Sequence, residues 1–167
     1  PGAVVTNLSS TMALDDIARA HGAVVHRTPI GDVNVSERIR ELGAVIGGEG
    51  NGGIINPAIQ LGRDAPAALA LVLQLMAGRD QSLTRSAAAL PRYVIVKRSR
   101  HLAREQAAPV IARMKSSAHA EQLDERDGLK LLWSDRWVHI RSSGTEPIVR
   151  VIAEARTQEQ AEALCEE

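Results

Sequence analysis

The sequence predicts an α/β plus α+β architecture: a three-layer α/β domain with a mostly parallel sheet, then a small domain with an antiparallel sheet backed by helices. A length of 167 residues is enough for two small domains. The first half alternates short apolar runs with helical patterns, an order typical of parallel strands joined by helical crossovers. The second half places strand patterns side by side with short turns between them, which is typical of antiparallel pairing. We place the boundary at Leu90–Pro91, so the predicted domains are residues 1–90 and 91–167.

The first predicted domain alternates strands with helices. Its strands are expected at residues 3–6, 23–28 and 45–46. Ser10 or Thr11 can cap the first helix, and Asn34 with Glu37 resembles a capping box for the second. Asp64 is expected to cap the third helix, which is the most apolar one. The side chains expected on the buried face of that helix are Leu69, Val72, Leu73 and Met76.

The second predicted domain reads as four strands and two helices. The strands are expected at residues 93–97, 129–133, 137–142 and 148–155. A tight turn at residues 134–136 joins the second strand to the third. Pro109 suggests that the first helix begins late, because proline is poorly tolerated inside a helix. Thr157 and Gln160 have capping-box spacing for the last helix, which should bury Cys165.

Composition limits the classes of function. Lys and Arg number 20 against 20 Asp and Glu, so a nucleic acid or a membrane held by charge is not the expected partner. No apolar stretch approaches the roughly 18 residues of a membrane span, and no signal-peptide pattern opens the chain. Cys165 is the single cysteine, and the five histidines show no metal-ligand spacing. We therefore expect a cytoplasmic globular protein with no metal site of its own in this chain.

The glycine-rich segment at residues 47–53 is the first candidate site. It matches neither the dinucleotide fingerprint nor the phosphate loop of nucleotide-binding proteins, because the required glycine and lysine spacings are missing. It does present Glu49 and Asn51 at the end of a predicted parallel strand, where ligands of such sheets bind. A carboxylate has two acceptor oxygens for adjacent sugar hydroxyls, and an amide both donates and accepts. A plain tight turn remains the alternative.

The second candidate site is the segment Arg141-Ser142-Ser143-Gly144-Thr145-Glu146-Pro147, with Arg150 shortly after it. Hydroxyls and backbone N–H groups around a glycine can form a nest of the size of an anion. The arginines supply a fork of donors that suits phosphate oxygens. An ordinary hairpin loop would explain the glycine and the proline but not this concentration of donors. The residue types therefore favour a phosphate site.

Together these segments resemble the third and fourth domains of the α-D-phosphohexomutases, the family of phosphoglucomutase, phosphomannomutase and phosphoglucosamine mutase. The similarity rests on GGEGNGG followed by LGRDAPAALALVLQLMA, and on RSSGTEPIVRVIAEA further along. The stretch RTPIGDVNVSERIRE resembles the T-x-x-G segment that precedes the sugar loop in that family. The resemblance covers nearly the whole chain.

The resemblance implies interconversion of hexose 1-phosphates and 6-phosphates through a phosphoserine and a bisphosphate sugar, with Mg²⁺. It places sugar contacts at Glu49, Asn51, Gly52, Thr28, Gly31 and Asp32. It places the non-reacting phosphate on Arg141, Ser142, Ser143, Gly144, Thr145 and Arg150. It assigns no catalytic residue and no metal ligand within this chain.

Two departures from the family pattern affect these expectations. Many relatives have G-E-x-S-G-H in the sugar loop, whereas this loop ends in Gly52-Gly53, and Asp32 stands where some relatives have histidine. The chain also shows neither a phosphoserine loop nor a D-x-D-x-D magnesium loop. We therefore expect the C-terminal half of a mutase, inactive alone, whose partners are a phosphosugar and the missing N-terminal domains. Mg²⁺ and the hexose bisphosphate would belong to the full-length enzyme. The alternative is a free-standing, non-catalytic phosphosugar-binding module.

Overall fold

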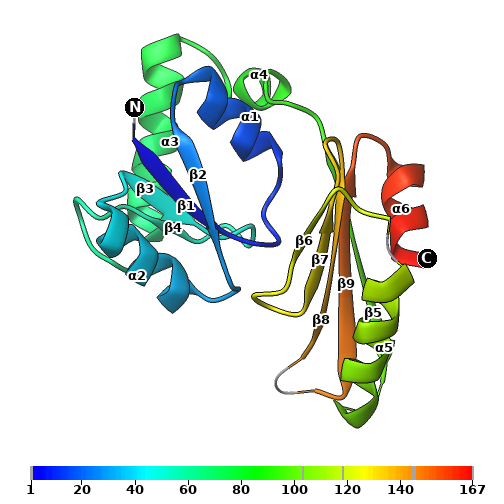
Figure 1. Cartoon of the computed structure of the whole chain (residues 1–167). Helices are drawn as coiled ribbons and strands as arrows, with labels where there is room; N and C mark the ends of the chain where they lie inside the picture. The colour runs from blue at the N-terminus through cyan, green and yellow to red at the C-terminus, as the bar shows by residue number, and fades with distance from the viewer. Residues whose placement is uncertain (1, 103, 118, 144–145, 167) are drawn as a thin grey trace. The chain divides into compact units, whose positions relative to one another are not determined.

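The computed structural model describes residues 2–102, 104–117, 119–143 and 146–166. The chain divides into two compact units, Pro1–Arg92 and Tyr93–Glu167, which are described separately (Figure 1).

The N-terminal unit is built on a four-stranded sheet with the strand order β2-β1-β3-β4. Its strands and helices are β1 Ala3–Asn7, α1 Ala13–Ala20, β2 Val24–Thr28, α2 Asp32–Leu42, β3 Ile46–Gly48, β4 Ile54–Ile55, α3 Ala65–Arg79 and α4 Leu83–Ala88. Strand β1 pairs in parallel with both β2 and β3, and only the short β4 runs antiparallel to its neighbour. The predicted mostly parallel sheet flanked by helices is confirmed.

The core of this unit lies between the sheet and α2. Val5 of β1 and Ile55 of β4 are fully buried and pack with Val35 and Ile39 of α2. Because such aliphatic side chains each contribute about 1.5–3 kcal/mol when buried, this cluster is what fixes α2 against the strands.

The second helix begins two residues earlier than its predicted capping box. Gly31 is the N-cap residue of α2, with φ of 131°, and Asp32 is the first helical residue. Asn34 lies inside the helix, where its amide Nδ2 donates to the carbonyl of Ile30 at 3.1 Å. The capping-box prediction was therefore wrong, because the helix starts after a glycine with positive φ and without a side-chain cap. The Asp64 cap of α3 is confirmed, since its Oδ1 accepts from the Ala67 N–H at 2.8 Å.

Helix α3 does not bury the face that its sequence suggested. Leu69 and Leu73 are 60% and 53% exposed, and Ala67 is the buried residue of this helix. Alanine and leucine occur on every side of α3, including the exposed Leu71 and Leu75. A helix that is apolar all round has no single face that its periodicity can identify.

The C-terminal unit has a five-stranded, fully antiparallel sheet with the order β5-β9-β8-β7-β6. Its elements are β5 Val94–His101, α5 Arg104–Ser117, β6 Gln122–Asp124, β7 Leu129–Leu132, β8 Trp137–Ser142, β9 Ile148–Ala155 and α6 Gln158–Glu166. The predicted antiparallel sheet backed by helices is confirmed. Strand β6 was not predicted, because only three residues form it.

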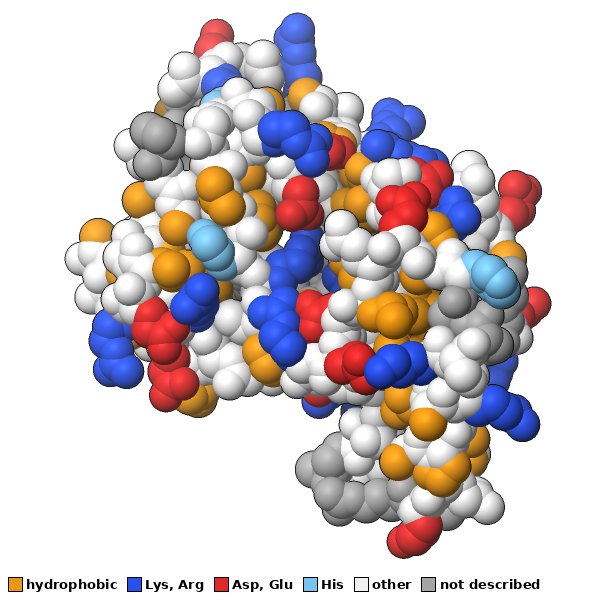
Figure 2. Space-filling model, in the orientation of Figure 1, with side chains coloured by type: hydrophobic (Ala, Val, Ile, Leu, Met, Phe, Trp, Pro, Cys, Tyr) orange, Lys and Arg blue, Asp and Glu red, His pale blue; other side chains and the backbone are white. Residues whose placement is uncertain are grey.

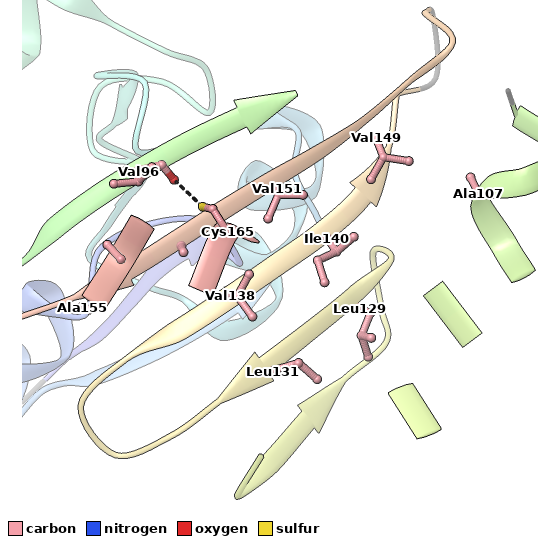
Figure 3. Packing of buried hydrophobic residues seen from close by; sticks show 12 residues of the cluster. Val96, Ala107, Leu129, Leu131, Val138, Ile140, Val149, Val151, Ala155 and Cys165 are labelled. Carbon is pink, nitrogen blue, oxygen red and sulfur yellow. Dashed lines mark hydrogen bonds between the residues drawn. The ribbon is translucent and has the colours of Figure 1, made fainter. Parts of the chain in front are cut away.

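The core of the C-terminal unit lies between one face of this sheet and the two helices. Figure 3 shows Leu129, Val138 and Ile140 from the strands facing the same side as Cys165 of α6. Cys165 is a free thiol near the Val96 carbonyl, and burial raises its pKa, so it remains a packed thiol rather than a nucleophile.

Pro109 lies inside α5, and the helix begins at Arg104, so the prediction of a late start was wrong. Ala107 is buried, and Ile111 and Met114 pack on the same core. The packing of this apolar face holds the first turn of α5 in spite of the proline.

Charge is mixed over the surface. On the face drawn in Figure 2, Lys and Arg side chains are interspersed with Asp and Glu. Among the described residues, no helix has both the length and the apolar character needed to cross a membrane.

Candidate functional site

Three parallel strands of the N-terminal unit end at the same edge of their sheet. β1 ends at Asn7, β2 at Thr28 and β3 at Gly48, and the register pairs Asn7 with Thr28 and Thr6 with Gly48. The side chains that follow these ends are therefore brought together, as expected for the ligand-binding edge of an α/β sheet.

The Glu49 carboxylate is held at this edge by donors from three segments. Its Oε1 accepts from the side-chain amide of Asn7 at 2.8 Å and from the backbone N–H of Gly31 at 2.9 Å. Its Oε2 accepts from the Asn51 amide at 3.3 Å. One carboxylate oxygen has two protein donors and the other has one, so Oε2 is the oxygen with capacity left for a ligand hydroxyl.

The glycine-rich segment forms a closed loop around Glu49. The Glu49 N–H donates to the Gly53 carbonyl at 2.9 Å, and the Gly52 N–H donates to the Glu49 carbonyl at 3.1 Å. Gly52 has φ of 94°, which favours glycine. An added Cβ at Gly48 would lie 2.5 Å from the Gly53 carbonyl oxygen, so the loop closes only over a glycine there. Asn51 accepts from the Gly53 N–H at 3.1 Å and is thereby fixed beside Glu49.

Of the other predicted sugar contacts at this edge, Gly31 contacts Glu49, whereas Thr28 and Asp32 have other partners. Gly31 touches Glu49 directly, as described above. The Thr28 hydroxyl donates to a backbone carbonyl within its own turn, that of Pro29 at 2.9 Å. Asp32 pairs with Arg63, which the sequence did not single out, at 3.1 Å between Oδ2 and Nε.

Asn7 is a residue of this edge that sequence reasoning missed. Its Oδ1 accepts from the Ser9 N–H and the Ser10 hydroxyl, both at 3.0 Å. These two bonds fix the orientation of the Asn7 amide, with Nδ2 directed towards Glu49. Arg27 donates to the carbonyls of Asn7 and Ser10 and so supports the same loop. The signal was available, because Asn7 directly follows the strand predicted at residues 3–6, just as the glycine-rich segment directly follows the strand predicted at residues 45–46.

A cavity of about 230 Å³ lies beside this loop. Glu49 and Gly50 are among the residues that line it, together with the apolar side chains of Val4, Leu14 and Ile54.

In the C-terminal unit the two arginines of the phosphate segment are cross-strand neighbours. Arg141 of β8 is paired in register with Arg150 of β9. Each has a carboxylate partner: Arg141 Nε lies 3.3 Å from Asp127 Oδ1, and Arg150 Nη2 donates to Glu146 Oε2 at 3.1 Å. Their guanidinium groups are thus oriented by the sheet and by these ion pairs.

The rest of this segment forms the connection between β8 and β9. Ser142 ends β8. The Ser143 N–H donates to the Ile148 carbonyl at 2.9 Å, and the Glu146 N–H donates to the Ser143 hydroxyl at 3.3 Å. These two backbone N–H groups therefore have acceptors within the protein. Gly144 and Thr145 lie outside the described residues.

His139 lies two residues before Arg141 on β8 and is fully buried. Burial lowers its pKa, an effect that outweighs its contact with the Asp127 carbonyl. Among the described residues, no three His, Cys, Asp or Glu side chains gather as metal ligands would.

The side chains of the two candidate sites are of types that bind polar ligands by hydrogen bonds and ion pairs. One loop offers a fixed carboxylate and an amide, which suit sugar hydroxyls. One strand pair offers two guanidinium groups, which suit phosphate oxygens.

Two family models together match the chain. The first, described as phosphoglucomutase/phosphomannomutase, alpha/beta/alpha domain III, matches residues 1–94. The second, the C-terminal domain of the same family, matches residues 93–167.

Individual relatives agree with these matches. A phosphoglucomutase/phosphomannomutase of Thermococcus kodakarensis is 36% identical over 99% of this chain. A solved family protein of Burkholderia thailandensis matches 99% of the chain and 36% of its own length with a TM-score of 0.82 and 22% identity. Structures of an Aspergillus fumigatus N-acetylphosphoglucosamine mutase, one with glucose 1,6-bisphosphate and one with GlcNAc-6P and magnesium, have TM-scores of 0.69 and 0.68 at 17% and 16% identity; each match covers 98% of this chain and 37% of that enzyme.

The chain spans little more than a third of the curated relatives, since it corresponds to 36% of the length of the T. kodakarensis protein. Both family models and the arrangement of the two sheets agree over this span. The chain therefore belongs to the phosphoglucomutase/phosphomannomutase family, of which it carries the third and the C-terminal domain.

Proposed function

We propose that this chain is the substrate-binding half of a phosphohexomutase, an intramolecular phosphotransferase that interconverts hexose 1-phosphates and 6-phosphates. In this proposal the N-terminal unit binds the sugar hydroxyls and the C-terminal unit anchors the phosphate that is not reacting. Anchoring one dianionic end of a sugar lets the other end be presented for transfer, because positioning accounts for much of phosphoryl-transfer catalysis.

The observation that carries the proposal is the fixed carboxylate of Glu49. Donors from Asn7, Gly31 and Asn51 hold it at the ligand-binding edge of the sheet. A loop kept only for its turn would have no use for a carboxylate held by two segments that are distant from it in sequence.

The phosphate would bind to Arg141 and Arg150 with help from Ser142, Ser143, Gly144 and Thr145. The register of β8 and β9 supports this part of the proposal, since Arg141 and Arg150 are directly opposite each other on the two strands. Thr28, Gly52 and Asp32 complete the proposed sugar contacts.

The cofactor belongs to the rest of the enzyme. The A. fumigatus relative has been solved with a hexose bisphosphate and with magnesium. The described residues of this chain contain no cluster of acidic side chains that would hold Mg²⁺, so none of its residues is given that task. Mg²⁺ and the phosphoserine would come from N-terminal domains, which are the proposed protein partner, in a cytoplasmic enzyme.

The binding test is a titration of the chain with glucose 1-phosphate, followed by amide chemical shifts. Shifts should concentrate at Ser143 of the phosphate segment and at Gly31, whose N–H donates to the Glu49 carboxylate. Saturable shifts elsewhere, with none at these amides, would contradict the proposal.

The activity test combines this chain with the N-terminal domains of a family member. Turnover of glucose 1-phosphate should require both halves and Mg²⁺, with none from this chain alone. Magnesium-dependent turnover by this chain alone would overturn the division of roles. If it binds phosphosugar but no mixture restores turnover, the chain is instead a non-catalytic binding module.

A further inference from the structure

The side chain of Arg63 lies directly over Gly53, the last residue of the sugar loop. A Cβ added to Gly53 would collide with Arg63 Cδ and would lie 3.0 Å from Arg63 Cγ. The same Cβ would lie 3.3 Å from Asn51 Oδ1. Arg63 and Asn51 therefore both lie beside Gly53, and the glycine is what makes room for the arginine.

The backbone beneath Arg63 is fixed on its C-terminal side. The N–H of the next residue, Asp64, donates to the Ile54 carbonyl at 2.9 Å, which ties the segment to β4. The Asp64 side chain caps α3. Arg63 thus projects from a position defined by both a strand and a helix start.

The Nε atom of the Arg63 guanidinium group has an ion-pair partner, and the two Nη atoms are available to a ligand. Nε pairs with Asp32 Oδ2 at 3.1 Å, while the side chain stays 52% exposed. Within the described part of the chain, Nη1 and Nη2 make no hydrogen bond. An ion pair at this exposure contributes little to stability, about 0–1 kcal/mol, so stability alone does not explain the arrangement.

A sugar site at this loop needs donors. Each hexose hydroxyl donates one hydrogen bond and can accept two, so a site must present N–H groups as well as acceptors. Glu49 supplies only acceptors, and the Asn51 amide uses one of its two N–H donors on Glu49 and its oxygen on the Gly53 N–H, which leaves a single N–H. The Nη groups of Arg63, whose side chain lies over the last residue of the same loop, can supply further donors.

We propose that Arg63 is a further substrate-contact residue, whose Nη groups donate to hydroxyl oxygens of the hexose while Glu49 accepts from the sugar. This rests on the proposed function of the loop and extends it to a residue outside the predicted set. Asp32, itself one of the proposed sugar contacts, also orients Arg63 through Nε on this proposal.

The test measures dissociation constants of the 167-residue chain for glucose 1-phosphate and for inorganic phosphate, from amide shifts. Arg63→Ala should raise the constant for glucose 1-phosphate about tenfold and leave that for inorganic phosphate unchanged, because the hydroxyls and not the phosphate lose a partner. Arg38→Ala is the matched control, since it removes another exposed arginine with a carboxylate partner from the same unit.

Gly53→Ala provides an independent route to the same site. Its Cβ should displace Arg63 and weaken glucose 1-phosphate binding by a similar factor. In an Arg63→Ala background the same glycine substitution should have little further effect, because the two changes act through one contact. Full additivity of the two effects would contradict the proposal.

The remaining outcomes distinguish a failure of the Arg63 inference from a failure of the proposed function. If Glu49→Gln weakens glucose 1-phosphate binding while Arg63→Ala does not, the inference about Arg63 is wrong and the proposed function stands. If neither variant changes binding, the proposed function itself fails. Equal weakening for both ligands would make Arg63 a phosphate contact and overturn its assignment to hydroxyls. Equal weakening by Asp32→Asn and Arg63→Ala, with matching losses of thermal stability, would show a structural role instead.

Discussion

The two candidate binding regions are positioned by different means. Glu49 sits in a loop and is held by hydrogen bonds from residues far away in sequence, Asn7 and Gly31. Arg141 and Arg150 sit on adjacent strands, and the register of the sheet places them opposite each other. Loop geometry therefore depends on a few side-chain contacts, whereas the arginine pair depends on the whole strand pairing. Substitutions should have local effects in the first region and more distributed effects in the second.

The largest expected effect is that of Arg141→Ala on ligand affinity. Loss of a charge-assisted contact to phosphate should weaken glucose 1-phosphate binding by about 1.5–3 kcal/mol. Calorimetric titration measures this, and denaturant unfolding of the same variant serves as the control for folding. An unchanged affinity combined with a large loss of stability would identify Arg141 as structural.

Next in size is the effect of Gly128→Ala on stability. Gly128 has φ of 83°, and an added Cβ would collide with the Ile140 carbonyl and lie 2.9 Å from Arg141 Cβ. We expect destabilisation of about 1–3 kcal/mol, with weaker phosphosugar binding because Arg141 and Asp127 are displaced. Urea unfolding measures the first effect.

Gly78→Ala is the comparison for this variant. Gly78 lies in α3, and nothing stands within 4 Å of an added Cβ. An alanine there should stabilise the helix by about 0.5–1 kcal/mol. If the two alanine variants have the same effect on stability, the strain assigned to Gly128 is absent.

A smaller effect is expected for Asn7→Ala. Glu49 would lose one of the two donors to Oε1, and the affinity for glucose 1-phosphate should fall by about 1 kcal/mol. The Gly31 amide shift should move in the free protein, because that amide shares the same carboxylate oxygen. Asn7→Asp should be worse than Asn7→Ala, since it places an acceptor where Glu49 needs a donor. The reverse order would show that Asn7 does not position Glu49.

The most gradual effect is the pH dependence that His139 confers. Burial lowers its pKa below the ordinary 6.5, so the folded state keeps it neutral where the unfolded chain binds a proton. Stability of the C-terminal unit should therefore decrease as pH falls below about 6.5. Denaturant midpoints between pH 7.5 and 5.5 measure this. A midpoint that rises on acidification would contradict the sign.

The sheet types and the position of the glycine-rich loop at the end of a strand were predictable from sequence. Strand and helix alternation distinguishes parallel from antiparallel pairing, and the glycine segment follows a predicted strand. The support for Glu49 was not predictable, because Asn7 lies 42 positions away and the contact exists only once β1 and β3 pair.

Two other differences between the sequence predictions and the structure also arise from contacts between distant segments. The pairing of Asp32 with Arg63 depends on the path of the segment between β4 and α3, which has no periodic pattern. The exposure of Leu69 and Leu73 depends on which side of an evenly apolar helix faces the sheet. Sequence patterns identify elements well, but they leave open which side chains from distant elements will touch.

The register that sets Arg141 opposite Arg150 also means that two like charges face each other across neighbouring strands, which opposes their pairing. Asp127 and Glu146 moderate that repulsion in the free protein. A bound dianion would remove the remainder, so occupancy of this corner and cohesion of the β8–β9 pair would reinforce each other. Ligand binding would therefore stabilise the pairing of the two strands that carry its binding site.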